Sequence, residues 1–171
     1  MTTLFVFSGL PGVGKTTLGR SLAREAGAVH LRIDSIEQGL RERCDLPLED
    51  WGYALACRIA ADNLRLGLSV VADSCNPIEV TRRAWEGVAE DCGVVCRNIE
   101  VICSDQGEHH RRVRSRVSDI AGLRLPTWSE VEGRAYDPWS RDRIVIDTAG
   151  RSADESLAIL FEALALGGRT S

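Results

Sequence analysis

Long hydrophobic runs are missing from this sequence. No segment reaches the roughly 18 consecutive apolar residues that a membrane span requires, and the first residues lack the basic leader of a signal peptide. A basic excess is missing as well, because the net charge is −4, which argues against a dedicated nucleic-acid binder. We therefore expect a cytoplasmic protein with neither a membrane nor a nucleic-acid partner.

The six cysteines include no C-x-x-C pair, which would begin many zinc and redox motifs. We expect buried, reduced thiols, as is usual for cysteines of a cytoplasmic protein. A zinc site formed by Cys92 and Cys96 with His109 or His110 is the alternative, although the spacing of these residues is not that of zinc motifs.

Lysine is almost absent. Lysine and arginine together number 21, and Lys15 is the only lysine among them. The N-K-x-D motif with which GTPases recognise guanine therefore cannot occur in this chain. Because arginine is used everywhere else, the single lysine points to a site that needs a compact ammonium group on a flexible stem.

Strand-like and helix-like segments alternate along the chain. Short apolar runs predict five strands, and the amphipathic patterns between them predict helices. The strands are expected within residues 4–7, 29–33, 69–72, 94–102 and 143–146. The helices are expected over residues 15–26, 35–43, 49–66, 76–92, 105–116, 127–134 and 152–167. Such alternation indicates parallel pairing with right-handed crossovers. We expect one domain over residues 1–171, a three-layer α/β/α sandwich around a five-stranded parallel sheet.

The phosphate-binding motif is complete. Residues 9–16 read G-L-P-G-V-G-K-T and match G-x-x-x-x-G-K-[ST] between a predicted strand and a predicted helix. Such a loop wraps a polyphosphate with backbone N–H groups, and the following helix points its positive end at the phosphates. The lysine bridges the outer phosphates, and the Thr16 hydroxyl group is a magnesium ligand. The residues of this segment expected to hold the nucleotide are Gly9, Pro11, Gly12, Val13, Gly14, Lys15, Thr16 and Thr17.

A sequence with this motif in this context resembles the small P-loop kinases. These include gluconate kinase, shikimate kinase, adenylylsulfate kinase, chloramphenicol phosphotransferase, the zeta toxins and the kinase half of polynucleotide kinase. It looks closest to the small bacterial P-loop proteins known as kinases or AAA-family ATPases. The resemblance covers nearly the whole chain and is most specific at residues 9–17. It implies a nucleoside/shikimate-kinase-like P-loop NTPase fold, with ATP and Mg²⁺ as cofactors.

Two aspartates follow predicted strands. In the kinases that this sequence resembles, an Asp at the position of Asp34 receives the proton of the acceptor hydroxyl group; the alternative is that Asp34 caps a helix. Asp73 ends a strand that resembles a Walker B strand and is expected to hold Mg²⁺ with Thr16; the alternative is a turn residue. Polynucleotide kinases place an arginine where Glu37 lies here, which argues against a polynucleotide acceptor. Asn76 is expected to cap the helix that follows it.

The most basic stretch is residues 109–116. Arg112 and Arg116 match the R-x-x-x-R pattern of the lid helix in the resembling kinases, which implies that both neutralise charge on the transferred phosphoryl group. A solvated basic face, or an RNA-binding patch, is the alternative. His109 and His110 are expected at the surface. Trp128 and Trp139 are expected either to close over a substrate or to pack beneath the lid.

The last strand leads into Asp147–Thr148–Ala149–Gly150. In the resembling kinases this loop cradles the adenine, so the resemblance implies that Thr148 is a nucleotide contact, as is Arg116 of the lid helix. The resulting hypothesis is an ATP- and Mg²⁺-dependent phosphotransferase that acts on a hydroxyl group of a small molecule. Its catalytic residues would be Lys15, Asp34, Arg112 and Arg116, its metal residues Thr16 and Asp73, and its mobile lid residues 108–141. An ATP-hydrolysing switch and a kinase of nucleic-acid ends are the alternatives.

Overall fold

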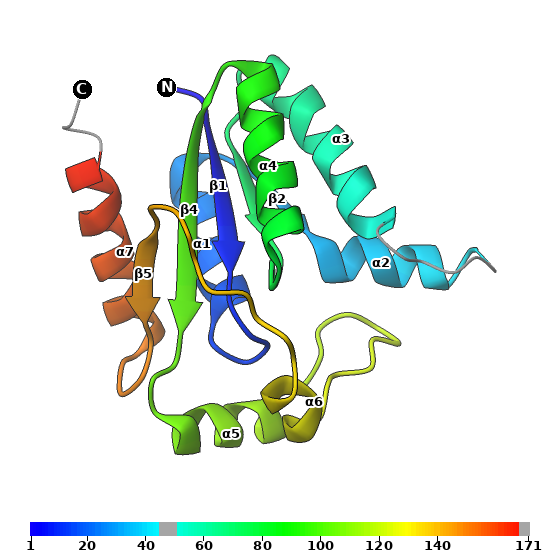
Figure 1. The fold of residues 1–171 in the computed structure, drawn as a ribbon, viewed down its shortest axis with the longest axis vertical. Coiled ribbons are helices and arrows are strands. Elements are labelled where there is room, and N and C mark those ends of the chain that lie inside the picture. The colour runs from blue at the N-terminus through cyan, green and yellow to red at the C-terminus, as the bar shows by residue number, and fades with distance from the viewer. Residues whose placement is uncertain (45–50, 168–171) are drawn as a thin grey trace.

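Five parallel strands form one sheet at the centre of the molecule (Figure 1). The structure is a computed structural model, which describes residues 1–44 and 51–167. The strand order is β2-β3-β1-β4-β5, so the first strand lies in the middle. The strands are β1 (Thr3–Ser8), β2 (Val29–Arg32), β3 (Val70–Asp73), β4 (Val95–Ile102) and β5 (Ile144–Asp147). Parallel order of this kind confirms the fold class that the alternating pattern predicted.

Helices cover both faces of the sheet (Figure 1). One face packs against α1 (Lys15–Ala26) and α7 (Ala153–Gly167), and the other against α3 (Trp51–Arg65) and α4 (Glu79–Cys92). α2 (Ile33–Arg41) packs on α3, while α5 (Gln106–Ser115) and α6 (Trp128–Glu132) lie beyond the carboxyl ends of the strands. No helix in the described ranges is long and apolar enough to cross a membrane.

The two faces of the sheet carry separate hydrophobic cores. Leu4 and Val6 point toward α3 and α4, where they meet the fully buried Trp85. Phe7 points the other way and packs with Leu22 of α1 and with α7. This division follows from the alternation of side chains along a strand, because both faces of a central parallel strand are covered by helices.

Most predicted elements are confirmed, with corrections at two helix starts. The helix at Lys15–Ala26 has the predicted bounds, whereas Ile33 opens α2 instead of ending β2. Asn76 is not a helix cap, because α4 begins at Glu79 with Ile78 as its N-cap and without a side-chain cap. Asn76 is instead fully buried and donates from Nδ2 to the Phe7 carbonyl oxygen at 2.8 Å. Residues 49 and 50 of the predicted third helix lie outside the described residues.

Candidate active site

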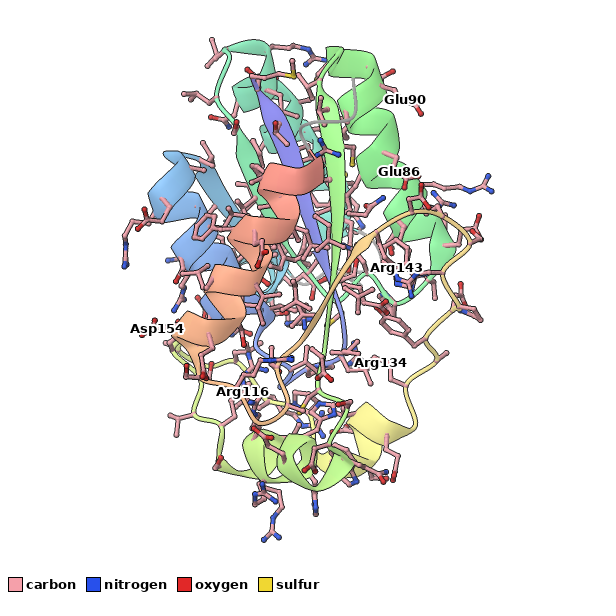
Figure 2. All side chains as sticks on the ribbon, turned by 90° about the vertical axis from the view of Figure 1, so that its left-hand side faces the viewer. Glu86, Glu90, Arg116, Arg134, Arg143 and Asp154 are labelled. Carbon is pink, nitrogen blue, oxygen red and sulfur yellow. The ribbon has the colours of Figure 1, made fainter. Side chains whose placement is uncertain are left out.

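A cleft of about 1090 Å³ opens at the carboxyl edge of the sheet. Parallel α/β sheets bind ligands at this edge, because the loops that follow the strands meet there. The cleft is lined by the P-loop, α2, the loop after β3, α5 and two further segments, within residues 122–134 and 148–156. Figure 2 shows Arg116 and Arg134, two of its lining arginines, below the ends of the strands.

The P-loop needs glycine at two close approaches. A side chain on Gly9 would place its Cβ 2.2 Å from the Val101 carbonyl oxygen, and the φ angle of Gly9 is 137°. A Cβ on Gly12 would lie 2.6 Å from Cγ2 of Val113 in α5, at a φ of 88°. Only glycine fits both the space and the backbone conformation at these positions. The loop is therefore held between β4 and α5.

The start of α1 is left open for an anion. Gly14 is its N-cap, no side chain caps it, and its first turn contains no acidic residue. The first N–H groups of a helix without a cap have no intrahelical partner and favour negative charge. Lys15 is only 8% exposed, and its Nζ donates to the Leu10 carbonyl oxygen at 2.9 Å. An ammonium group held this way inside the loop can turn to a phosphate oxygen.

Asp73 lies in the same cleft at the end of β3, where it is 3% exposed. Its Oδ2 atom is buried, accepts no hydrogen bond, and has His30 Nε2 at 3.4 Å. The pKa of Asp73 is lowered, because the effects of His30, Lys15 and Thr16 outweigh burial, which alone would raise it. Asp73 is therefore a carboxylate in the folded protein.

The residues around Asp73 fit a magnesium ion. Asp73 has a buried carboxylate oxygen without a hydrogen bond, and its carboxyl group interacts with the Thr16 side chain; Mg²⁺ prefers such hard oxygen ligands. No group of three His, Cys, Asp or Glu side chains forms a metal site within residues 1–44 and 51–167. Magnesium does not need one, because proteins usually hold it through one or two carboxylates and the phosphates of the substrate.

Asp34 lines the cleft from the first turn of α2. It is not the helix cap considered from the sequence, because Arg32 occupies the N-cap position. Glu37 lies one turn further along the cleft and pairs with Arg41 at 3.1 Å. Its side chain fits because Gly52 of α3 leaves room, where a Cβ would lie 2.4 Å from Glu37 Cγ.

The two candidate arginines differ in their contacts. Arg112 donates from Nη1 to Thr148 Oγ1 at 2.7 Å and from Nη2 to the Thr148 carbonyl oxygen at 2.9 Å. It also pairs with Glu108 at 2.6 Å. Arg116 lines the cleft and makes no ion pair with any residue of the described ranges. Arg112 is thus fixed at the loop after β5, while Arg116 is available to a ligand.

Thr148 is 4% exposed and joins three parts of the site. Its hydroxyl group lies 2.9 Å from the Val13 carbonyl oxygen of the P-loop and accepts from Arg112. Its backbone N–H donates to the Ile102 carbonyl oxygen at 2.9 Å. The side chain predicted as a nucleotide contact therefore holds the P-loop and α5 together, and it also borders the cleft.

His109 contradicts the sequence prediction of a surface residue. It is 6% exposed, and its Nε2 lies 2.8 Å from the Pro11 carbonyl oxygen of the P-loop. Trp128 of α6 packs edge-on against its ring, with ring centroids 5.1 Å apart. A chain of contacts therefore runs from the P-loop through α5 to α6. No local sequence pattern indicates this role, because the two partners are 98 residues apart.

Trp139, like Trp128, packs against other side chains of the protein. The Arg82 guanidinium group lies 4.1 Å from the centroid of the Trp139 ring. Arg82 is 1% exposed and donates to the Asp137 carbonyl oxygen at 2.9 Å. The end of the predicted lid is thereby fixed to the start of α4.

The zinc alternative is wrong. Cys92 ends α4, and its Sγ lies 3.8 Å from the Ala61 carbonyl oxygen, whereas His109 contacts the P-loop. α4 ends near the amino ends of the strands, whereas α5 lies beyond their carboxyl ends (Figure 1). All six cysteines are free and half-buried, and burial raises the pKa of Cys96 to about 12 and that of Cys57 to about 11. Cys57 and Cys96 are therefore protonated thiols at neutral pH.

Comparisons with known proteins agree with this geometry. The sequence profile of an AAA domain family matches residues 4–124, and no curated protein matches the sequence. A protein of Chloroflexus aurantiacus j-10-fl has a similar structure, with a TM-score of 0.71 at 19% identity over 97% of each chain. The APS kinase of Mycobacterium tuberculosis, in complex with AMPPNP and APS, has a TM-score of 0.68 at 18% identity. The match covers 96% of this chain and 98% of that chain. A gluconokinase of Sinorhizobium meliloti 1021 has a TM-score of 0.66 at 16% identity, and the match covers 99% of this chain and 98% of that chain. At these identities the likeness shows the fold, which is that of small P-loop kinases.

Proposed function

The chain belongs to the AAA domain family, and we propose that it uses its P-loop to transfer the γ-phosphoryl group of ATP to a hydroxyl group of a small molecule. The kinase fold of its structural neighbours supports nucleotide-dependent phosphoryl transfer in general. The choice of ATP rests on the missing guanine motif.

One observation carries the proposal. The P-loop, Asp34 of α2 and Asp73 of β3 line one continuous cleft at the carboxyl edge of the sheet. Phosphoryl transfer requires a phosphate grip, a carboxylate near the acceptor oxygen and charge neutralisation within one space. A simple nucleotide-binding switch would need no carboxylate on the acceptor side.

Each side chain then has a role that its contacts support. Lys15 and the N–H groups of the P-loop bind the outer phosphates, and Asp34 orients the acceptor hydroxyl group and accepts its proton. Arg116 turns to the transferred phosphoryl group, while Arg112 keeps α5 on the loop after β5. Thr16 and Asp73 would hold Mg²⁺, which supplies positive charge to the β- and γ-phosphate oxygens when bound.

The test is a screen of hydroxyl-bearing metabolites with ATP labelled in its γ-phosphoryl group. We expect ADP release above basal hydrolysis together with a labelled, phosphorylated product. Lys15→Ala provides the control without a functional P-loop. ADP release that depends on a protein partner and yields no labelled product would support a regulatory ATPase instead, and labelled nucleic-acid ends would support a polynucleotide kinase.

A further inference from the structure

One face of α2 forms a wall of the cleft beyond Asp34. Asp34, Glu37, Gln38 and Arg41 all line the cleft and follow the spacing i, i+3, i+4 and i+7. Residues at this spacing project from the same side of a helix. Because α2 leads away from the strand ends (Figure 1), this face extends the site from the reacting hydroxyl group toward the rest of the acceptor.

Residues 122–134, which include α6, form the facing wall. Gly122 approaches α2 so closely that a Cβ there would lie 2.9 Å from Gln38 Nε2. Arg124, Glu130 and Arg134 line the cleft from this side, together with apolar side chains of residues 123–126. The two walls enclose the space next to Asp34 that an acceptor would fill.

Most charges of these walls are already paired. Glu37 pairs with Arg41 at 3.1 Å, and Glu130 pairs with Arg124 at 2.7 Å. The Arg134 guanidinium group makes no hydrogen bond or ion pair within the described ranges, although its positive charge acts on Glu37. Burial raises the pKa of Glu37, and the positive charges of Arg41 and Arg134 oppose that effect. Arg134 is exposed and lines the cleft without an ion pair in the described ranges, so its guanidinium group is free to bind an anion at the acceptor end, below the strands in Figure 2.

We propose that the acceptor carries an anionic group, a carboxylate or a phosphate, and that Arg134 binds this group while Asp34 holds the reacting hydroxyl group. A guanidinium group presents a planar fork of N–H donors that matches both kinds of oxyanion. The proposal rests on the proposed function, because it names the class of acceptor for the same cleft. A neutral acceptor would leave Arg134 without a partner in the closed site.

The first experiment measures the binding of an anion to Arg134 in the absence of catalysis. Sodium sulfate is titrated into protein saturated with Mg²⁺ and AMPPNP, so that the phosphate sites of the P-loop are occupied. The Nε–H signals of ¹⁵N-labelled arginines are followed by NMR, and Arg134→Lys identifies the Arg134 signal by its loss. We expect a saturable shift of that signal, with no such shift for the exposed Arg58 of α3. Equal shifts for both arginines, or a change matched by sodium chloride at equal ionic strength, would show an adventitious ion only and would overturn the proposal.

The second experiment measures selectivity among acceptors that share one carbon skeleton. Neutral, carboxylated and phosphorylated forms of each active compound are compared in the labelled-ATP assay. In Arg134→Ala we expect the KM for the anionic acceptor to rise roughly 10- to 100-fold, far more than the KM for ATP, with partial recovery in Arg134→Lys. Arg58→Ala should match the wild type. A preferred neutral acceptor, or an unchanged acceptor KM in Arg134→Ala, would contradict the proposal. Sulfate binding without any labelled product would instead count against the proposed phosphotransfer alone.

Discussion

At the scale of single residues, Lys15 is the first test of the site. Its ammonium group is held at the Leu10 carbonyl oxygen within hydrogen-bond reach of the loop that would wrap the phosphates. Charged hydrogen bonds contribute about 1.5 to 3 kcal/mol, so Lys15→Ala should weaken ATP binding by at least about tenfold. Calorimetry on both proteins measures this, and GTP should bind the wild type no better than ATP. Equal ATP affinity in the two proteins would remove Lys15 from the phosphate grip.

The two aspartates should respond differently to loss of charge. Asp34→Asn changes only the acceptor side, so it should abolish transfer and leave the affinity for Mg²⁺-ATP nearly intact. Asp73→Asn removes a buried carboxylate beside Thr16, so it should raise the Mg²⁺ concentration needed for half-maximal turnover. Turnover measured against Mg²⁺ concentration separates the two effects. Normal turnover by Asp34→Asn would leave that side chain without a catalytic role.

Residues of contiguous motifs were predictable, whereas residues defined by distant contacts were not. The P-loop could be identified because eight consecutive residues carry its chemistry. The sequence predicted His109 at the surface, because no residue near it in the sequence indicates its contact with the Pro11 carbonyl oxygen. Arg134 carried no signal either, because its place in the cleft depends on how residues 122–134 fold back onto α2.

At the scale of elements, α5 offers a matched pair of arginines. Arg116 lines the cleft at the end of the helix, whereas Arg114 is exposed and does not line it. Arginines that neutralise a transferred phosphoryl group contribute roughly 10³- to 10⁵-fold to the rate in related reactions. Arg116→Ala should therefore reduce kcat far more than ATP affinity, and Arg114→Ala should leave both near the wild-type values. An RNA-binding helix would behave differently, because both substitutions would weaken RNA binding to a similar degree.

The start of a helix was harder to predict than its existence. The sequence favoured Asn76 as a cap because Asn-Pro-x-Glu is typical of a helix start. In the structure Asn76 has a φ of 42°, and its side chain donates a hydrogen bond to the end of β1. This tertiary contact replaces the helix cap that the local sequence pattern predicted. Asp105, Thr127 and Ser152 do cap their helices, and no distant residue of the ranges 1–44 and 51–167 competes for their side chains.

At the scale of the whole molecule, the cleft is covered by a segment that is fixed at both ends. Asp119 pairs with Arg20 of α1 and with Arg32 at the end of β2, where Arg32 Nη1 lies 2.8 Å from Asp119 Oδ1. Asp137 accepts from the Glu79 N–H at 2.9 Å, and its carbonyl oxygen accepts from Arg82. A lid over residues 108–141 stays a prediction. These contacts hold the two ends of the segment, so any closing motion falls between Asp119 and Asp137 and moves α6 relative to α5, on which Trp128 packs.

The contact of Asp119 makes this motion testable. Arg20 and Arg32 hold the pKa of the Asp119 carboxyl group well below its ordinary value. A lowered pKa means that the contact stabilises the fold above the ordinary value of about 3.9, and that this contribution is lost as the pH falls toward the lowered pKa. Asp119→Asn should mimic this loss at neutral pH, and it leaves the 6% exposed Arg32 side chain without its carboxylate.

Hydrogen exchange then measures the lid directly. In the wild type we expect residues 120–136 to exchange faster without nucleotide than with Mg²⁺ and AMPPNP, because closing brings the segment onto the phosphates and excludes water. Asp119→Asn should increase exchange in this segment without nucleotide. The matched control is Asp62→Asn, which removes the exposed pair of Asp62 with Arg65 on α3 and should leave exchange in the segment unchanged.

Because Arg32 directly precedes α2, the segment that closes is connected through Asp119 to the helix that carries Asp34. Closure should therefore bring the acceptor wall and the catalytic carboxylate into place together, and equal protection with and without nucleotide would exclude such a step.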